Sequence, residues 1–132
     1  MAVEGLITLP SRFPPKETAD KLASAVTSHG MTLVARVDHA AAAAKAGLDL
    51  RPTEVLIFGN PSAGTLLMQI AQPIGLDLPL KALVWQNDAG DTWVSYQDLG
   101  WLTKRYGLTP AAQPTVDKMV SLLKVVVEEA PG

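Results

Sequence analysis

The chain has no cysteine, no strong excess of either charge, few aromatic residues and no long hydrophobic run. Without cysteine, its 132 residues cannot form disulfides, thiolate nucleophiles, zinc–thiolate sites or iron–sulfur clusters, so packing must stabilise the fold. The 13 acidic and 11 basic residues leave a net charge of −2. A charge this small does not attract a nucleic-acid backbone or an anionic membrane, so we expect neither partner.

Two kinds of hydrophobic segment are also missing. Residues 1–10, MAVEGLITLP, contain no basic run ahead of a long apolar stretch, so they do not resemble a secretory signal. No apolar run approaches the roughly 20 residues that a membrane-spanning helix needs. We therefore expect a cytoplasmic protein.

What the chain does contain is the composition of an ordinary globular domain. Hydrophobic residues make up 48% of it and charged residues 18%. A chain of this length buries about two-thirds of its unfolded surface, which is enough for a hydrophobic core. No repeat and no long linker divides the chain, so residues 1–132 are expected to form a single domain.

Hydrophobic periodicity predicts both strands and helices. Strands are predicted at 3–9, 31–38, 53–59, 78–86 and 92–97, long helices at 15–29 and 115–129, and short helices at 39–47, 61–72 and 98–107. The last two strands are joined by NDAGD, which is typical of a tight hairpin and excludes a purely parallel sheet. The predicted fold class is α+β: an antiparallel sheet of about five strands in β-α-β4-α order, with the long helices packed on one face and short helices inserted between strands.

Individual residues add local expectations. Asp38 and Asn60 precede predicted helices, where their side-chain oxygens would accept the free N–H groups of the first turn. Pro10 is expected to interrupt regular strand pairing. The alanine-rich helix at 39–47 is expected to have a close packing neighbour. Strict alternation over 31–38 places its odd-numbered residues on one side of the strand.

At this point the sequence shows a resemblance to a known family. The run DHAAAAAKAGLDLRPTEVLIFGNPSAGTLLMQ at 38–69, followed by IGLDLPLKALVW and WVSYQD, resembles the domain of unknown function 302 family. The resemblance is clearest over roughly residues 5–107. It implies a small α+β fold similar to the TATA-binding-protein-like group, with a helix inserted after the first strand, and a homodimer. It implies no established activity, and a fold alone supplies none.

Two candidate site residues lie at helix starts. Asn60 opens the segment NPSAGT at a strand-to-helix junction, where free N–H groups can hold an anion. The segment has neither GxxxxGK[ST] nor GxGxxG, so Asn60 acting simply as a helix cap is the plainer interpretation. His39 follows Asp38 and is either a proton shuttle or metal ligand, or a surface histidine with a local hydrogen bond.

Further candidates lie in the predicted strands. Lys81 is surrounded by apolar residues, and it either reaches solvent or pairs with a carboxylate, for which Glu54 is the expected partner. Trp85 and Trp93 are expected to face each other across the hairpin, while Tyr96 points to the opposite face from Trp93. Because no basic residues are interleaved with these aromatics, nucleic-acid binding is not expected, and core packing or a dimer surface is favoured.

Two functional hypotheses follow. The first is a non-enzymatic binding or interaction module: a homodimer, joined through an exposed sheet edge or the apolar arc of the last helix, with a small organic or anionic ligand between sheet and helix. Its expected ligand-binding residues are His39, Glu54, Asn60, Lys81, Trp85 and Tyr96, with no metal and no cofactor. The second is a cysteine-free hydrolase or isomerase that uses His39 with Asp38 or Glu54. A purely structural partner without a ligand pocket is a third possibility.

Overall fold

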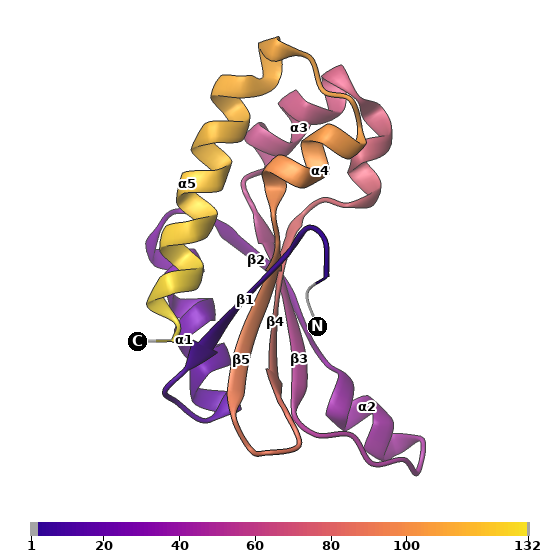
Figure 1. The fold of residues 1–132 in the computed structure, drawn as a ribbon, viewed down its shortest axis with the longest axis vertical. Coiled ribbons are helices and arrows are strands. Elements are labelled where there is room, and N and C mark those ends of the chain that lie inside the picture. The colour runs from indigo at the N-terminus through magenta and orange to yellow at the C-terminus, as the bar shows by residue number, and fades with distance from the viewer. Residues whose placement is uncertain (1–2, 132) are drawn as a thin grey trace.

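The computed structural model describes residues 3–131, which form a sheet, two long helices and several short ones (Figure 1). In chain order the elements are β1 (Leu6–Ser11), α1 (Pro15–Ser28), β2 (Thr32–Asp38), α2 (His39–Lys45), β3 (Thr53–Gly59), α3 (Pro61–Ile70), the 3-10 helix η1 (Gln72–Leu76), β4 (Leu80–Gln86), β5 (Thr92–Gln97), α4 (Leu99–Arg105), the 3-10 helix η2 (Pro110–Ala112) and α5 (Gln113–Glu129). This confirms the predicted α+β class and the β-α-β4-α order.

The five strands form one antiparallel sheet in the order β1-β5-β4-β3-β2. The first strand therefore pairs with the last, and α1 carries the chain from one edge of the sheet to the other. Pro10 lies within β1 in regular register with Trp93, so the prediction that it would interrupt pairing was wrong. An edge strand accepts proline because one side of it has no strand partner that needs its missing N–H.

The two long helices cover one face of the sheet, as predicted (Figure 1). The core lies between them and the sheet, and its fully buried side chains include Leu56, Phe58, Val84 and Val94 from the strands, Leu22 and Val26 from α1, and Val126 and Val127 from α5. Each such side chain contributes about 1.5–3 kcal/mol when it leaves water. The short helices α2, α3 and α4 lie toward the two ends of the sheet (Figure 1).

The strict alternation expected for β2 is broken. The pairing register with β3 shifts between Leu33 and Ala35, which is the signature of a bulge. Beyond the bulge, Arg36 lies opposite Leu56 and therefore on the helix-covered face, while Val37 lies opposite Val55 on the other face. The extra residue thus places a charged side chain at the edge of the covered face, where it meets two carboxylates described below.

The helix caps are confirmed, but the expected packing of α2 is not. Asp38 Oδ1 accepts a hydrogen bond from Ala41 N at 2.9 Å, and Asn60 Oδ1 accepts one from Ser62 N at 3.0 Å. Helix α2 projects from the body of the molecule (Figure 1), and none of its residues is buried. Its alanines therefore provide helix propensity and not the close packing that was predicted.

Candidate ligand site

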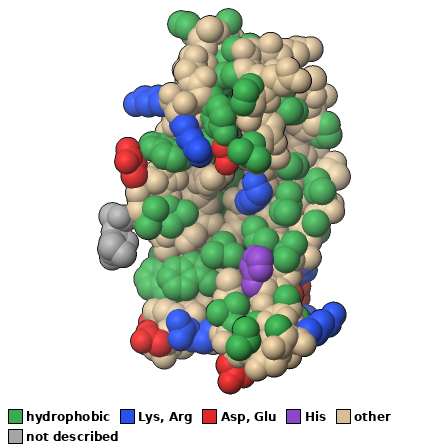
Figure 2. Space-filling model, turned by 90° about the vertical axis from the view of Figure 1, so that its right-hand side faces the viewer, with side chains coloured by type: hydrophobic (Ala, Val, Ile, Leu, Met, Phe, Trp, Pro, Cys, Tyr) green, Lys and Arg blue, Asp and Glu red, His purple; other side chains and the backbone are tan. Residues whose placement is uncertain are grey.

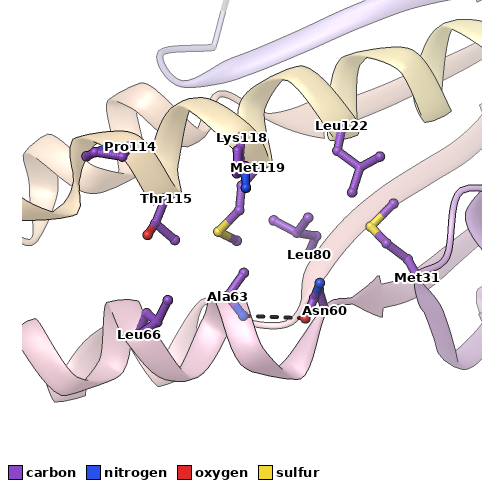
Figure 3. Close-up of a pocket in the computed structure, with 10 residues that line it drawn as sticks. All are labelled: Met31, Asn60, Ala63, Leu66, Leu80, Pro114, Thr115, Lys118, Met119 and Leu122. Carbon is purple, nitrogen blue, oxygen red and sulfur yellow. Dashed lines mark hydrogen bonds between the residues drawn. The ribbon is translucent and has the colours of Figure 1, made fainter.

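A cavity of about 550 Å³ opens between α3 and α5 (Figure 3). Its walls come from Ala63 and Leu66 on α3 and from Met119 and Leu122 on α5, and Leu80 and Met31 close its inner side. Leu80 and Met31 are the first residue of β4 and the residue before β2, and both are buried. We call this space the α3–α5 cavity.

Local sequence explains why α3 leaves room for the cavity. Leu67 on α3 is fully buried, while Leu66 beside it is 50% exposed. The helix therefore anchors through one leucine and presents the other along the cavity wall. Ala63, one turn earlier, has only a methyl group, so α3 does not fill the space in front of α5.

Three polar side chains line the α3–α5 cavity: Asn60 at the start of α3, and Thr115 and Lys118 on α5. The oxygen of Asn60 is occupied by the α3 cap, where it accepts from Ser62 N at 3.0 Å and from Ala63 N at 3.4 Å. Figure 3 shows its amide nitrogen turned toward the space between the helices. Lys118 lines the same cavity from α5. Within residues 3–131, neither Asn60 Nδ2 nor Lys118 Nζ has a hydrogen-bond or ion-pair partner.

The polar candidates predicted from the sequence do not gather at one place. Asn60 lines the cavity, whereas His39 begins the exposed helix α2 and Lys81 Nζ donates to Pro79 O at 3.5 Å. The expected pairing of Lys81 with Glu54 was wrong. In the sheet register Glu54 lies opposite Val84 and Lys81 opposite Ile57, so alternation puts the two charges on opposite faces.

Glu54 instead binds Arg36. The guanidinium donates from Nε at 2.8 Å and from Nη2 at 3.0 Å to the two carboxylate oxygens of Glu54, and Nη1 donates to Asp20 at 2.9 Å. The hydrogen bonds that Arg36 donates to Glu54 raise the pKa of Arg36 above its already high ordinary value, and the bond that Arg36 donates to Asp20 lowers the pKa of Asp20. A second cleft lies next to this network and is lined by Arg36 and Glu54, which bind each other. Its other charged residues also have partners, since Asp38 caps α2 and Lys16 pairs with Asp20, so this cleft is a weaker candidate for a ligand.

The aromatic side chains are divided between the two faces of the sheet. Trp85 and Trp93 lie opposite each other with ring centroids 6.3 Å apart, which confirms the expected pair. Trp85 Nε1 donates to Ser95 Oγ at 2.9 Å. Tyr96 points to the helix-covered face, as expected, and is 8% exposed. Trp85 and Tyr96 therefore do not wall the same space.

Comparison with known proteins assigns the family. The family model described as "Domain of unknown function DUF302" matches residues 7–126. The chain belongs to this family. The crystal structure of an uncharacterized conserved DUF302 protein from Bacillus stearothermophilus has the same fold, with a TM-score of 0.84 and 19% sequence identity, and the match covers 97% of this chain and 99% of that one.

This DUF302 chain also matches longer curated proteins. It is 43% identical over 128 residues to a fluoride-specific ion channel, FluC 1, of Brucella suis and to FluC 2 of Brucella melitensis. The match covers 97% of this chain but 50% and 47% of those proteins, so the chain spans about half their length. Across residues 3–131, none of the helices combines the length and apolarity needed to cross a bilayer.

Lys118, Met119 and Met31 are cavity residues that sequence reasoning missed in this DUF302 domain. One signal was present, because the apolar arc of the last helix is wider than one sheet face requires and includes Leu122. Leu122 packs beside the core and lines the cavity. The extra width of the arc therefore marks a second surface of α5, the one that faces α3.

Proposed function

We propose that this DUF302 domain is a binding module that holds a small organic ligand in the α3–α5 cavity. The observation that carries the proposal is a space of about 550 Å³ with mainly apolar walls and a few polar groups. Small-molecule sites in proteins typically enclose roughly 300–1,000 Å³ and have this composition. The sequence-based expectation placed the ligand between the sheet and a long helix, whereas this cavity lies between the two helices α3 and α5, with Leu80 as its strand residue.

Binding is favoured over catalysis by the residues that line the cavity. Among the described residues there, none is a carboxylate or a histidine. The enzymatic alternative, His39 with Asp38 or Glu54, gains no geometric support, because Asp38 caps α2 and Glu54 binds Arg36. No hydrogen bond joins His39 to either carboxylate within residues 3–131, so an acid–base pair is not preassembled.

The binding proposal is tested with a neutral apolar fluorophore, N-phenyl-1-naphthylamine, whose emission rises when it enters an apolar site. We expect saturable binding to the unaltered chain. The variant Leu66→Trp adds bulk to the cavity wall at a side chain that is 50% exposed, so it should reduce binding at least about fivefold with little loss of stability.

The matched control is Ile70→Trp. Ile70 lies one turn further along α3, is 40% exposed and does not line the cavity. It should bind the fluorophore as the unaltered chain does. Equal binding by all three proteins, or no saturable binding by the unaltered chain, would contradict a ligand site between α3 and α5.

We also propose that the domain is a homodimer joined through the sheet face that α1 and α5 leave uncovered. We call this surface the open face. From the three central strands it presents Thr53, Val55, Ile57, Lys81, Leu83, Trp85, Trp93, Ser95 and Gln97. Among these, Lys81 is the one charged side chain. Figure 2 views the molecule from this side and shows hydrophobic side chains spread over it. Such a face matches a second copy of itself better than it matches a charged partner.

The curated relatives support the view of the domain as one part of a larger assembly. These relatives are named fluoride-specific ion channels. They are about twice as long as this chain, and the match covers 50% and 47% of their lengths. We take from them that a domain of this kind occurs joined to a further segment. The binding module is thus proposed to act beside a further segment or partner.

A further inference from the structure

We propose that the ligand of the α3–α5 cavity is an organic monocarboxylate, with its carboxylate between Asn60 Nδ2 and Lys118 Nζ and its apolar body against the leucines and methionines. This inference rests on the proposed binding function and adds the chemical class of the ligand. Three features support it: the orientation of the Asn60 amide, which the helix cap fixes, the charge of Lys118, which has no ion-pair partner among residues 3–131, and the apolar composition of the cavity walls.

The Asn60 amide is held in one orientation by the helix cap. Its oxygen accepts from the backbone N–H groups of Ser62 and Ala63. A rotated amide would point its own N–H groups at those two donors, so the cap fixes which end faces the helix. The amide nitrogen must then face away from the α3 backbone, and Figure 3 shows it on the side of the cavity. Asn60 is exposed, so its amide N–H groups can meet water when the cavity is empty and can donate to an acceptor on a ligand that enters it.

Lys118 is an exposed lysine whose charge has no carboxylate partner in the described part of the chain. Its neighbour Asp117 accepts from Gln113 Nε2 at 2.7 Å, one turn back along α5. No carboxylate lines the cavity among residues 3–131, and no salt bridge there includes Lys118. A cation and an N–H donor on opposite walls complement a negatively charged acceptor.

The single positive charge and the mainly apolar lining of the cavity indicate which class of anion fits best. One lysine balances one negative charge, so a monoanion fits better than a phosphate ester, which carries close to two charges at neutral pH. Thr115 adds one hydroxyl, and the rest of the lining is apolar, including Leu66, Leu80, Met119 and Leu122, so it offers little to the several hydroxyl groups of a sugar. An aliphatic or aromatic carboxylate satisfies both conditions.

The test compares octanoate with 1-octanol, which has the same chain length and no charge, as competitors of the neutral fluorophore. Lys118→Met keeps the apolar stem and removes the charge. It should weaken octanoate about threefold to fivefold, the size of one partly exposed ion pair, and leave 1-octanol within about twofold. Asn60→Asp keeps a capping oxygen and replaces the amide donors by a negative charge, so it should weaken octanoate at least as much.

The controls separate this inference from the binding proposal. Lys124→Met removes a lysine of α5 that does not line the cavity, so it should bind octanoate as the unaltered chain does. If the fluorophore binds but octanoate does not displace it, or if Lys118→Met weakens both competitors equally, the carboxylate inference is wrong while the cavity remains a binding site. If neither competitor nor fluorophore binds, both proposals fail.

Discussion

Both tyrosines of the chain lie in surroundings that oppose their ionisation. Burial, with the nearby charges of Glu128 and Asp98, raises the pKa of Tyr96. The hydrogen bond that the Tyr106 hydroxyl donates to Asp77 raises the pKa of Tyr106. An absorbance titration at 295 nm should therefore show no tyrosine ionising at the ordinary pKa of about 10 and two ionising above it.

The sign of the stability effect follows from these shifts. A folded-state pKa above the unfolded value means that the protonated tyrosine stabilises the fold below about pH 10, and that this stabilisation is lost as pH rises through the folded pKa. Asp77→Asn removes the charged acceptor, so it should move one tyrosine toward its ordinary pKa and leave the other unchanged. A tyrosine that ionises near pH 10 in the unaltered chain would contradict the prediction that the pKa of both tyrosines is raised.

At the scale of elements, two helix caps of the same residue type should differ in their importance. Asp98 Oδ1 accepts from Gly100 N at 3.0 Å and begins α4, whose Leu99 and Leu102 are buried. Asp38 caps α2, which buries nothing. We expect Asp98→Ala to lower the free energy of unfolding by about 1 kcal/mol and Asp38→Ala to lower it by less than about 0.5 kcal/mol.

Chemical denaturation and hydrogen exchange together check this difference. Asp38→Ala should speed exchange of the α2 amides without moving the denaturation midpoint, because α2 opens locally and independently of the core. Asp98→Ala should shift the midpoint, because loss of its cap also disturbs buried leucines. Equal midpoint shifts in the two variants would show that α2 is coupled to the core in a way its exposure does not indicate.

Most elements were predictable because their patterns are local. The hairpin between β4 and β5 follows from the turn sequence NDAGD, and α5 follows from apolar residues at helical spacing. The β2 bulge was not predictable, because only pairing with β3 reveals that two residues share one partner position. The exposure of α2 was missed for a similar reason, since alanine is compatible with both close packing and solvent.

The candidate site was predictable only in part. Asn60 was identified from its position between a strand and a helix, which is a local signal. Lys118 lies far along the chain and has nothing in its flanking sequence that distinguishes it from other exposed lysines of α5. The partner of Glu54 required the register of β2, because Arg36 reaches the covered face only beyond the bulge. Contacts set by the pairing of distant strands or by helix packing leave little trace in a single sequence, such as the wide apolar arc of α5 that includes Leu122.

At the scale of the whole molecule, the two faces of the sheet differ in what covers them. One face is covered by α1 and α5, while the open face has no comparable layer over its central strands (Figures 1 and 2). Layered folds usually cover an apolar sheet surface with another element. Val37, at the edge of the open face, is 38% exposed, and Leu83 in its middle is only half-buried. A second copy packed against this face would complete the missing layer.

The dimer prediction distinguishes the open face from the apolar arc of α5. Leu83→Glu places a charge in the middle of the open face and should convert a dimer into a monomer, because a buried unpaired carboxylate costs several kcal/mol. Val125→Glu places the same charge on α5 at a residue that is 44% exposed, and should leave the dimer intact. Light scattering after size exclusion gives the mass of each protein, with circular dichroism to show that both variants fold. A monomeric unaltered chain, or a monomeric Val125→Glu beside a dimeric Leu83→Glu, would exclude the open face as the interface.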